Sequence, residues 1–200
     1  MPRVSDEHLA SRRRQILDAA RTCFLRNGFH ATSMHDVIAE AGLSVGAVYR
    51  YFKSKNDIVT AIAEEVVSGV NESLTDLAAS DLPITATLAR ALTFVDAQTG
   101  PDGMFRLAIQ VWAEAMRDPA LAELVSGAYR RIRGNFVELA RRAQERGELP
   151  ASADPEAVGA VLYGLMPSYA LQRVLTGTPD RETFLSGVTA ILEPVLAVPR

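Results

Sequence analysis

The sequence predicts an all-α protein of nine helices, and three observations lead to this fold class. Apolar residues recur with the period of helices that bury one face. Clusters of Gly, Pro and Asp separate these periodic stretches along the 200 residues. No stretch alternates apolar and polar residues as a half-buried strand does. The composition, with 48% apolar residues, is typical of a globular protein.

The expected helices are separated by residues that break or cap helical structure. Ser54, followed three residues later by Asp57, caps the fourth helix, and Asp154 precedes a proline that suits the first position of the eighth. The first four helices are expected at residues 6–27, 34–41, 45–52 and about 55–79. The other five are separated by breaks at residues 80–83, 99–103, 117–119, 147–154 and 177–180, and the ninth helix ends near Ala197.

The second expected helix has a defined start, an apolar face and a defined end. Thr32 or Ser33 caps its start, and Asp36 stands where a capping box places an acidic residue. Gly42 permits the left-handed backbone that ends it. One face of this helix is apolar because four residues recur at helical spacing: Met34, Val37, Ile38 and Ala41.

The third expected helix follows after a short turn. Ser44 caps it, and Val48 and Phe52 share its inward face. The outward and flanking positions are Val45, Gly46, Ala47, Tyr49, Arg50 and Tyr51. Two short helices joined by a glycine turn and followed by a basic exit are typical of a helix-turn-helix DNA-binding unit.

The chain closely resembles the N-terminal domain of the TetR (tetracycline-repressor) family of transcriptional regulators over about residues 12–62. The residues that carry the resemblance are Gln15-Ile16-Leu17-Asp18-Ala19-Ala20, Phe24, Asn27-Gly28-Phe29, Thr32-Ser33, Ala41-Gly42-Leu43-Ser44, Gly46, Val48-Tyr49-Arg50-Tyr51-Phe52 and Lys53-Ser54-Lys55. The resemblance implies a two-domain homodimer. Residues 1–55 would form a three-helix DNA-binding domain that continues into a connecting helix at 55–79, and residues 56–200 would bind a small effector and dimerise.

The resemblance also implies which residues contact double-stranded DNA. The family positions that contact phosphates or sugars correspond here to Thr32, Ser33, Ser44, Tyr49, Tyr51 and Lys55. The positions that approach base edges correspond to Val45, Gly46, Ala47 and Arg50. Because residues 45–47 carry no polar side chain, base recognition is expected to depend on thymine methyl groups, on Arg50 and on DNA shape.

The charge distribution supports a DNA-binding N-terminal region. The net charge of the chain is −3, but residues 1–55 carry +4 and residues 56–200 carry −7. The only lysines, Lys53 and Lys55, both follow the third helix. A local basic footprint favours phosphate contact even when the whole chain is acidic.

The C-terminal region is expected to enclose an effector pocket between helices. Its aromatic and methionine residues suit a lipophilic or aromatic molecule, although each of them is also a normal core residue. Glu114 is expected either to face a cationic ligand or to pair with Arg117. The candidate pocket residues are Phe94, Phe105, Trp112, Met116, Tyr129, Tyr163 and Met166.

The last two helices are the expected dimer interface. They carry apolar residues together with small residues that allow close helix packing, and the resemblance assigns them to a four-helix interface about a two-fold axis. The alternative is that they complete the core of a monomer. The candidate interface residues are Ala157, Ala160, Val161, Gly164, Val188, Ile191 and Leu192.

Other function classes find less support in the sequence. No apolar run would span a bilayer and no signal-like segment begins the chain, so a cytoplasmic protein without membrane contact is expected. His8, His30 and His35 lack metal-ligand spacing, and Cys23 is expected in the core. Neither a catalytic site nor a cofactor is therefore expected. A ligand-released repressor is the main interpretation, with an activator of the same fold, a helical carrier or an enzyme as alternatives.

Overall fold

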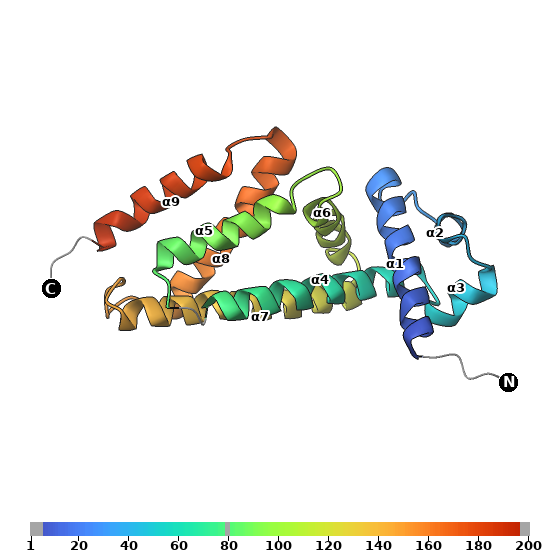
Figure 1. Ribbon diagram of the computed structural model, residues 1–200, viewed down its shortest axis with the longest axis horizontal. Helices are drawn as coiled ribbons and strands as arrows, with labels where there is room; N and C mark the ends of the chain where they lie inside the picture. Colours follow the sequence, from blue (N-terminus) through green and yellow to red (C-terminus); the bar gives the residue numbers. More distant parts are fainter. Residues whose placement is uncertain (1–5, 79–80, 197–200) are drawn as a thin grey trace. The chain divides into compact units, whose positions relative to one another are not determined.

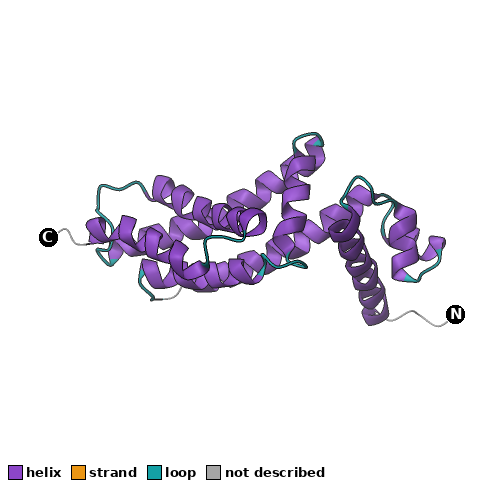
Figure 2. Cartoon of the chain, turned by 90° about the horizontal axis from the view of Figure 1, so that it is seen from above, coloured by secondary structure: helices purple, strands orange, loops and turns teal. Residues whose placement is uncertain are grey.

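The computed structural model describes residues 6–78 and 81–196, and in these ranges it contains only helices as regular structure (Figure 1, Figure 2). The all-α fold class is therefore confirmed. The predicted helix ends at Ala79 and Ala197 lie outside the described residues. The helices are α1 (Asp6–Asn27), α2 (Met34–Ala41), α3 (Val45–Tyr51), α4 (Lys55–Ala78), α5 (Ile84–Ala97), α6 (Met104–Ala115), α7 (Pro119–Glu145), α8 (Pro155–Thr176) and α9 (Arg181–Leu196).

The helix-turn-helix has the caps that its sequence predicts. Ser33 caps α2 and forms a capping box with Asp36, whose carboxylate accepts from the Ser33 backbone N–H at 2.8 Å. These hydrogen bonds lower the pKa of Asp36. Gly42 ends α2 in the left-handed region at φ +62°, and the Ser44 hydroxyl accepts from the backbone N–H of Ala47 at the start of α3. Both helices are therefore fixed at their ends by local hydrogen bonds.

The helices form two compact units. The first contains residues 1–66 and 107–124, and the second contains residues 67–106 and 125–200. The sequence-based boundary placed everything after residue 55 in the C-terminal domain, whereas the structure groups most of α6 with α1, α2 and α3. The grouping depends on the proximity of segments far apart in the sequence, which helical periodicity does not reveal.

The first unit is built around α1. α1 packs on α2, and α3 and the beginning of α4 contribute further buried residues to this unit. Cys23 is completely buried in this core, as predicted, and burial raises the pKa of its thiol. Glu65 of α4 adds ion pairs to α1, at 2.5 Å from Arg13 and 2.8 Å from Arg21. The fully buried residues of this core include Ile16, Leu17, Phe24, Val37, Val48 and Ile58.

The core of the second unit lies among α5, α7, α8 and α9. Tyr169 of α8 is completely buried, and its hydroxyl donates to Asp96 of α5 at 2.5 Å. Burial is the main cause that raises the pKa of Tyr169 to about 12, and the bond to Asp96 adds to it. Arg173 of α8 lies 3.4 Å from the same carboxylate. Within the described ranges, none of the helices is both long and apolar enough to cross a membrane.

Candidate nucleic-acid interface

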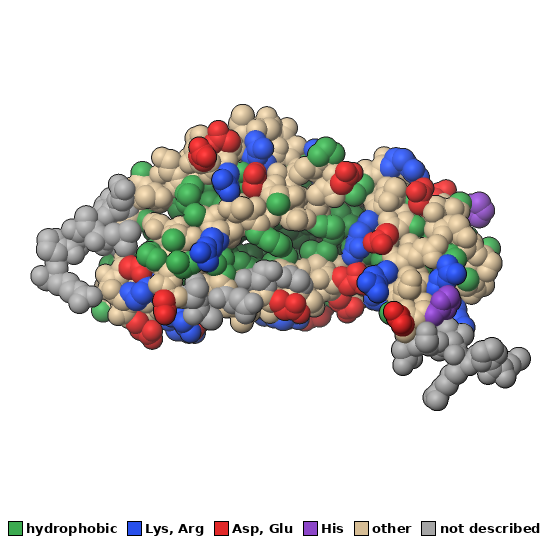
Figure 3. Space-filling model, in the orientation of Figure 1, with side chains coloured by type: hydrophobic (Ala, Val, Ile, Leu, Met, Phe, Trp, Pro, Cys, Tyr) green, Lys and Arg blue, Asp and Glu red, His purple; other side chains and the backbone are tan. Residues whose placement is uncertain are grey.

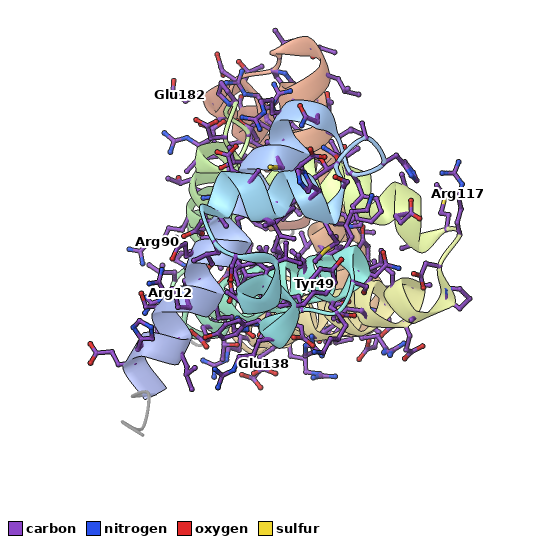
Figure 4. The ribbon with its side chains drawn as sticks, turned by 90° about the vertical axis from the view of Figure 1, so that its right-hand side faces the viewer. Arg12, Tyr49, Arg90, Arg117, Glu138 and Glu182 are labelled. Carbon is purple, nitrogen blue, oxygen red and sulfur yellow. The ribbon has the colours of Figure 1, made fainter. Side chains whose placement is uncertain are left out.

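The third helix presents one face to solvent and is anchored by the other. Val48 is completely buried and Phe52, directly after the helix, is nearly so. Val45 is 56% exposed and Tyr49 is 38% exposed, and Arg50 is exposed beside them. Tyr49 is labelled in Figure 4, which shows it on α3. A rigidly held helix with a free face is the geometry that enters the DNA major groove.

Most of the predicted DNA-contacting side chains are accessible. Ser44 and Gly46 are exposed at the start of α3, and Ser33 is exposed at the start of α2. Ala47 and Tyr51 are half-buried. The nearby Lys53 is also exposed, and its ammonium donates to the backbone carbonyl of Tyr49 at 2.6 Å, at the C-terminal end of α3. Helix ends and exposed hydroxyls are therefore available to phosphates.

Thr32 does not have the exposed position that its predicted phosphate contact requires. Its side chain is 1% exposed, and its hydroxyl donates to the carbonyls of Gly28 at 2.8 Å and Cys23 at 3.2 Å. The hydroxyl therefore joins the turn after α1 to the last turns of that helix. Thr32 therefore supports the backbone that precedes α2, and Ser33 is the hydroxyl that reaches the surface.

Lys55 is likewise turned inward. Its ammonium donates to the carbonyls of Phe29 at 2.6 Å and Thr32 at 2.8 Å, and lies 4.2 Å from the centre of the Phe29 ring. Burial lowers the pKa of Lys55 despite the nearby carboxylate of Glu114. The predicted phosphate contact is thus replaced here by hydrogen bonds within the chain. A sequence shows that a lysine follows α3, but not which way its flexible side chain turns.

An apolar pocket lies in the second unit, between α4, α5 and α7. Its free interior is about 10 Å³, which is room for about one water molecule. This is far smaller than the pockets that enclose drug-sized ligands, so a ligand enters only if the lining helices move apart. Figure 3 shows apolar side chains reaching the surface of this unit. The pocket is lined by Leu74, Leu77, Thr87, Leu88, Ala91, Asn135, Phe136 and Leu139.

The predicted effector residues lie elsewhere. Trp112 and Met116 belong to the first unit, where Met116 is 83% exposed. The rings of Tyr129 and Tyr163 pack edge to face with centres 5.2 Å apart, and Met166 is buried in the core. Of the two remaining candidates in the second unit, Phe94 is partly exposed and Phe105 packs against the core. The prediction missed the pocket because aliphatic residues that line it look like any other core residues.

Glu114 pairs with a residue other than Arg117, which was one of its two predicted partners. Its carboxylate lies 3.0 Å from the Nε2 atom of His30, and its side chain is 18% exposed. His30 follows α1 directly, whereas Glu114 is on α6, and both belong to the first unit. The expected pair with Arg117 required neighbours on one helix, but the contact that forms joins segments far apart in the sequence.

The predicted dimer residues divide between the surface and the protomer core. Val161 is 67% exposed and Ile191 is 74% exposed. Ala157, Ala160 and Gly164 are exposed on α8 beside Val161. Val188 is only 7% exposed, and Leu192 is partly buried against the same core. Val188 and Leu192 therefore stabilise the single chain, because they pack α9 against the rest of the second unit.

Comparison with known proteins agrees with this architecture. Residues 16–62 match the family described as bacterial regulatory proteins, tetR family, and residues 86–197 match the family described as BetI-type transcriptional repressor, C-terminal. The HTH-type transcriptional repressor Rv1474c of Mycobacterium tuberculosis is 43% identical over 65 residues, which are 32% of this chain and 35% of that repressor. The chain thus spans about a third of the length of that relative.

Two further relatives match nearly the whole chain. The HTH-type transcriptional regulator BetI of Klebsiella pneumoniae is 27% identical over 194 residues, or 95% of each chain. The structure of Salmonella enterica GusR superposes with a TM-score of 0.80 at 24% identity and covers 98% of this chain and 100% of that one. The second family match alone extends over more than half of the chain. The chain therefore belongs to the TetR family of bacterial regulatory proteins, and its C-terminal region is of the BetI type.

Proposed function

We propose that this protein is a homodimeric transcriptional repressor that binds a palindromic operator and is released from it by a small, neutral, apolar effector. The observation that carries the proposal is α3, which is capped by Ser44, anchored by the buried Val48 and free on the face of Val45 and Arg50. Such a helix presents base-reading side chains in a fixed orientation. Repression is favoured over activation because related proteins are named as repressors.

The dimer is supported by an apolar surface on α8 and α9. Val161, Leu175 and Ile191 are each more than 60% exposed, and Leu171 is 41% exposed. Small residues beside Val161, among them Gly164, allow another helix to approach closely. An exposed apolar surface of this kind marks an interaction site in a folded protein. A two-fold dimer through this surface would match the symmetry of a palindromic operator.

The class of effector follows from the pocket lining. Six of its eight lining residues have apolar side chains. Of the two polar ones, Thr87 donates to the carbonyl of Pro83 at 3.1 Å. The other, Asn135, is already paired as well. Its amide donates to Asn71 at 3.0 Å and accepts from Thr75 at 3.1 Å. Among the lining residues that the structure describes, none carries a charge. An ion bound there would lose its hydration without compensation, so a neutral and apolar ligand is favoured.

The experiment that tests this function is selection of DNA from a random pool by the purified protein at near-physiological salt. Enrichment of an inverted repeat supports a dimeric, sequence-specific regulator. Binding that weakens steeply as salt rises supports phosphate contacts. Failure to enrich any sequence with a folded protein, both with and without added apolar compounds, would contradict the proposal.

Base recognition by Val45 predicts a dependence on thymine methyl groups. Replacing thymine with deoxyuridine at the contacted position should weaken binding about fourfold per half-site. This corresponds to the free energy of burying about one methyl group. In the V45A variant the same replacement should have little effect, because the methyl contact is already absent. Competition binding with the two operators and the two proteins measures this. Equal affinity of the wild-type protein for both operators would rule out methyl recognition by Val45.

The pocket predicts selective stabilisation by neutral compounds. Naphthalene at about ten times its Kd should raise the free energy of unfolding by about 1.4 kcal/mol and release the operator. Tetramethylammonium should do neither. The A91L variant fills part of the pocket, so it should bind the operator normally but lose the response to naphthalene. Thermal melts with and without each compound provide the measurement, and a response to the cation alone would contradict the assigned ligand class.

A further inference from the structure

The turn that joins α1 to α2, residues 28–33, has an unusual source of support. Gly28 ends α1 in the left-handed region at φ +81°, and its N–H donates to the carbonyl of Phe24 at 2.9 Å. The next N–H, that of Phe29, points away from the helix that has ended. Such groups at helix ends need partners from elsewhere in the structure.

Gln110 of α6 provides these partners. Its side-chain oxygen accepts from the N–H of Phe29 at 2.7 Å, and its side-chain nitrogen donates to the carbonyl of Phe24 at 3.2 Å. A single amide thus bonds on both sides of Gly28, and a Cβ added to Gly28 would make an ordinary contact with its oxygen at 3.9 Å. Both bonds join residues of the same compact unit, although more than eighty positions separate them in the sequence.

The other supports of the turn come from the beginning of α4 and from the turn itself. Lys55 donates to the carbonyls of Phe29 and Thr32, and the Thr32 hydroxyl donates to that of Gly28. All of these bonds are accepted by carbonyls of the turn, so the Phe29 N–H has Gln110 as its acceptor. The turn is therefore held from one side by the beginning of α4 and from the other by α6.

We propose that Gln110 is a positioning residue for DNA binding, and that α6 completes the DNA-binding unit through it. Ser33, which caps α2, directly follows the residues that Gln110 and Lys55 hold. The turn at Gly42 connects α2 to α3, so the start of α2 determines where α3 lies. The inference rests on the proposed function, since it concerns how the DNA-reading helix is held.

A second contact from the same face of α6 is weaker. Glu114 is four residues after Gln110, hence on the same side of the helix, and meets His30 of the turn. The His30 side chain is 71% exposed, so this pair contributes little. Gln110, with two bonds to backbone groups, is the residue whose loss should matter.

The test replaces Gln110 with Met, which keeps its length but removes both hydrogen bonds. Hydrogen exchange of the Phe29 amide in the full-length protein should become faster. Operator affinity, measured well below the melting temperature, should fall about tenfold, as expected when two backbone hydrogen bonds are lost from the binding-competent state. The Q110E variant retains an acceptor for Phe29 but no donor for Phe24, so its affinity should be intermediate, and it decides the question if Q110M does not fold.

The same substitution at Gln98, at the end of α5 in the second unit, is the control and should change neither measurement. Faster exchange at Phe29 with unchanged operator affinity would make Gln110 merely structural and overturn the proposal. Unchanged exchange at Phe29 would show that the contact is not made and would overturn it as well. If the wild-type protein selects no operator, the proposed function fails before any variant is compared, which separates the two failures.

Discussion

Replacing Val161 with glutamate should convert the dimer into a monomer and lower operator affinity at least about a hundredfold. This is the typical gain in affinity when two linked units bind two half-sites together. Val161 is 67% exposed in the single chain, so the change should leave the protomer folded. In the proposed dimer, however, two carboxylates would be buried near the two-fold axis among apolar side chains. Burying a charge without a partner costs several kcal/mol, more than most single interface contacts contribute.

Sedimentation equilibrium and operator binding, each measured over a range of protein concentration, test this prediction. M116E is the matched control, because Met116 is 83% exposed but belongs to the first unit. It should remain dimeric and should bind the operator normally. A V161E protein that sediments as a dimer would exclude the face of Val161 and Ile191 as the interface. A monomeric V161E protein with undiminished affinity would instead separate dimerisation from DNA recognition.

The DNA-binding helices could be predicted from the sequence in detail because their determinants are local. Ser33, Gly42 and Ser44 fix the ends of α2 and α3 through bonds to residues at most four positions away. The spacing of apolar residues likewise predicted that Val37 and Val48 are buried. Local hydrogen bonds and helical periodicity are the features that a single sequence expresses directly.

Most of the parts that differ from prediction depend on contacts between segments distant in the sequence. Lys55 was expected to face DNA, but the carbonyls of Phe29 and Thr32 in the turn after α1 draw its ammonium inward. Thr32 was also expected to face DNA, but its hydroxyl bonds to the carbonyls of Gly28 and Cys23. Gln110 was not singled out, because nothing near it in the sequence indicates that it meets Phe29. The pocket residues escaped notice for a related reason, since Leu88 and Leu139 fit a core equally well. A pattern shows that a helix has an apolar face but not what covers it.

Replacing Gly159 with alanine should destabilise the second unit by about 1–3 kcal/mol, the cost of forcing an extra carbon into a packed interior. Gly159 of α8 is buried against α7, and an added Cβ would lie 2.7 Å from the backbone nitrogen and Cα of Val137. Backbone atoms cannot turn aside as a flexible side chain can. The gain that alanine normally brings to a helix, at most about 1 kcal/mol, would not offset this clash unless the helices separate.

Gly134 on α7 offers the opposite expectation from the same substitution. It is exposed, and an added Cβ would have no neighbour within 4 Å, so G134A should stabilise the protein by about 0.5–1 kcal/mol. Urea unfolding followed by circular dichroism compares both variants with the wild-type chain. If G159A were as stable as G134A, α7 and α8 could not approach as closely as the contact between Gly159 and Val137 requires. Both substitutions bring the same gain in helix propensity. Opposite signs of the change in unfolding free energy would therefore isolate the effect of close helix packing.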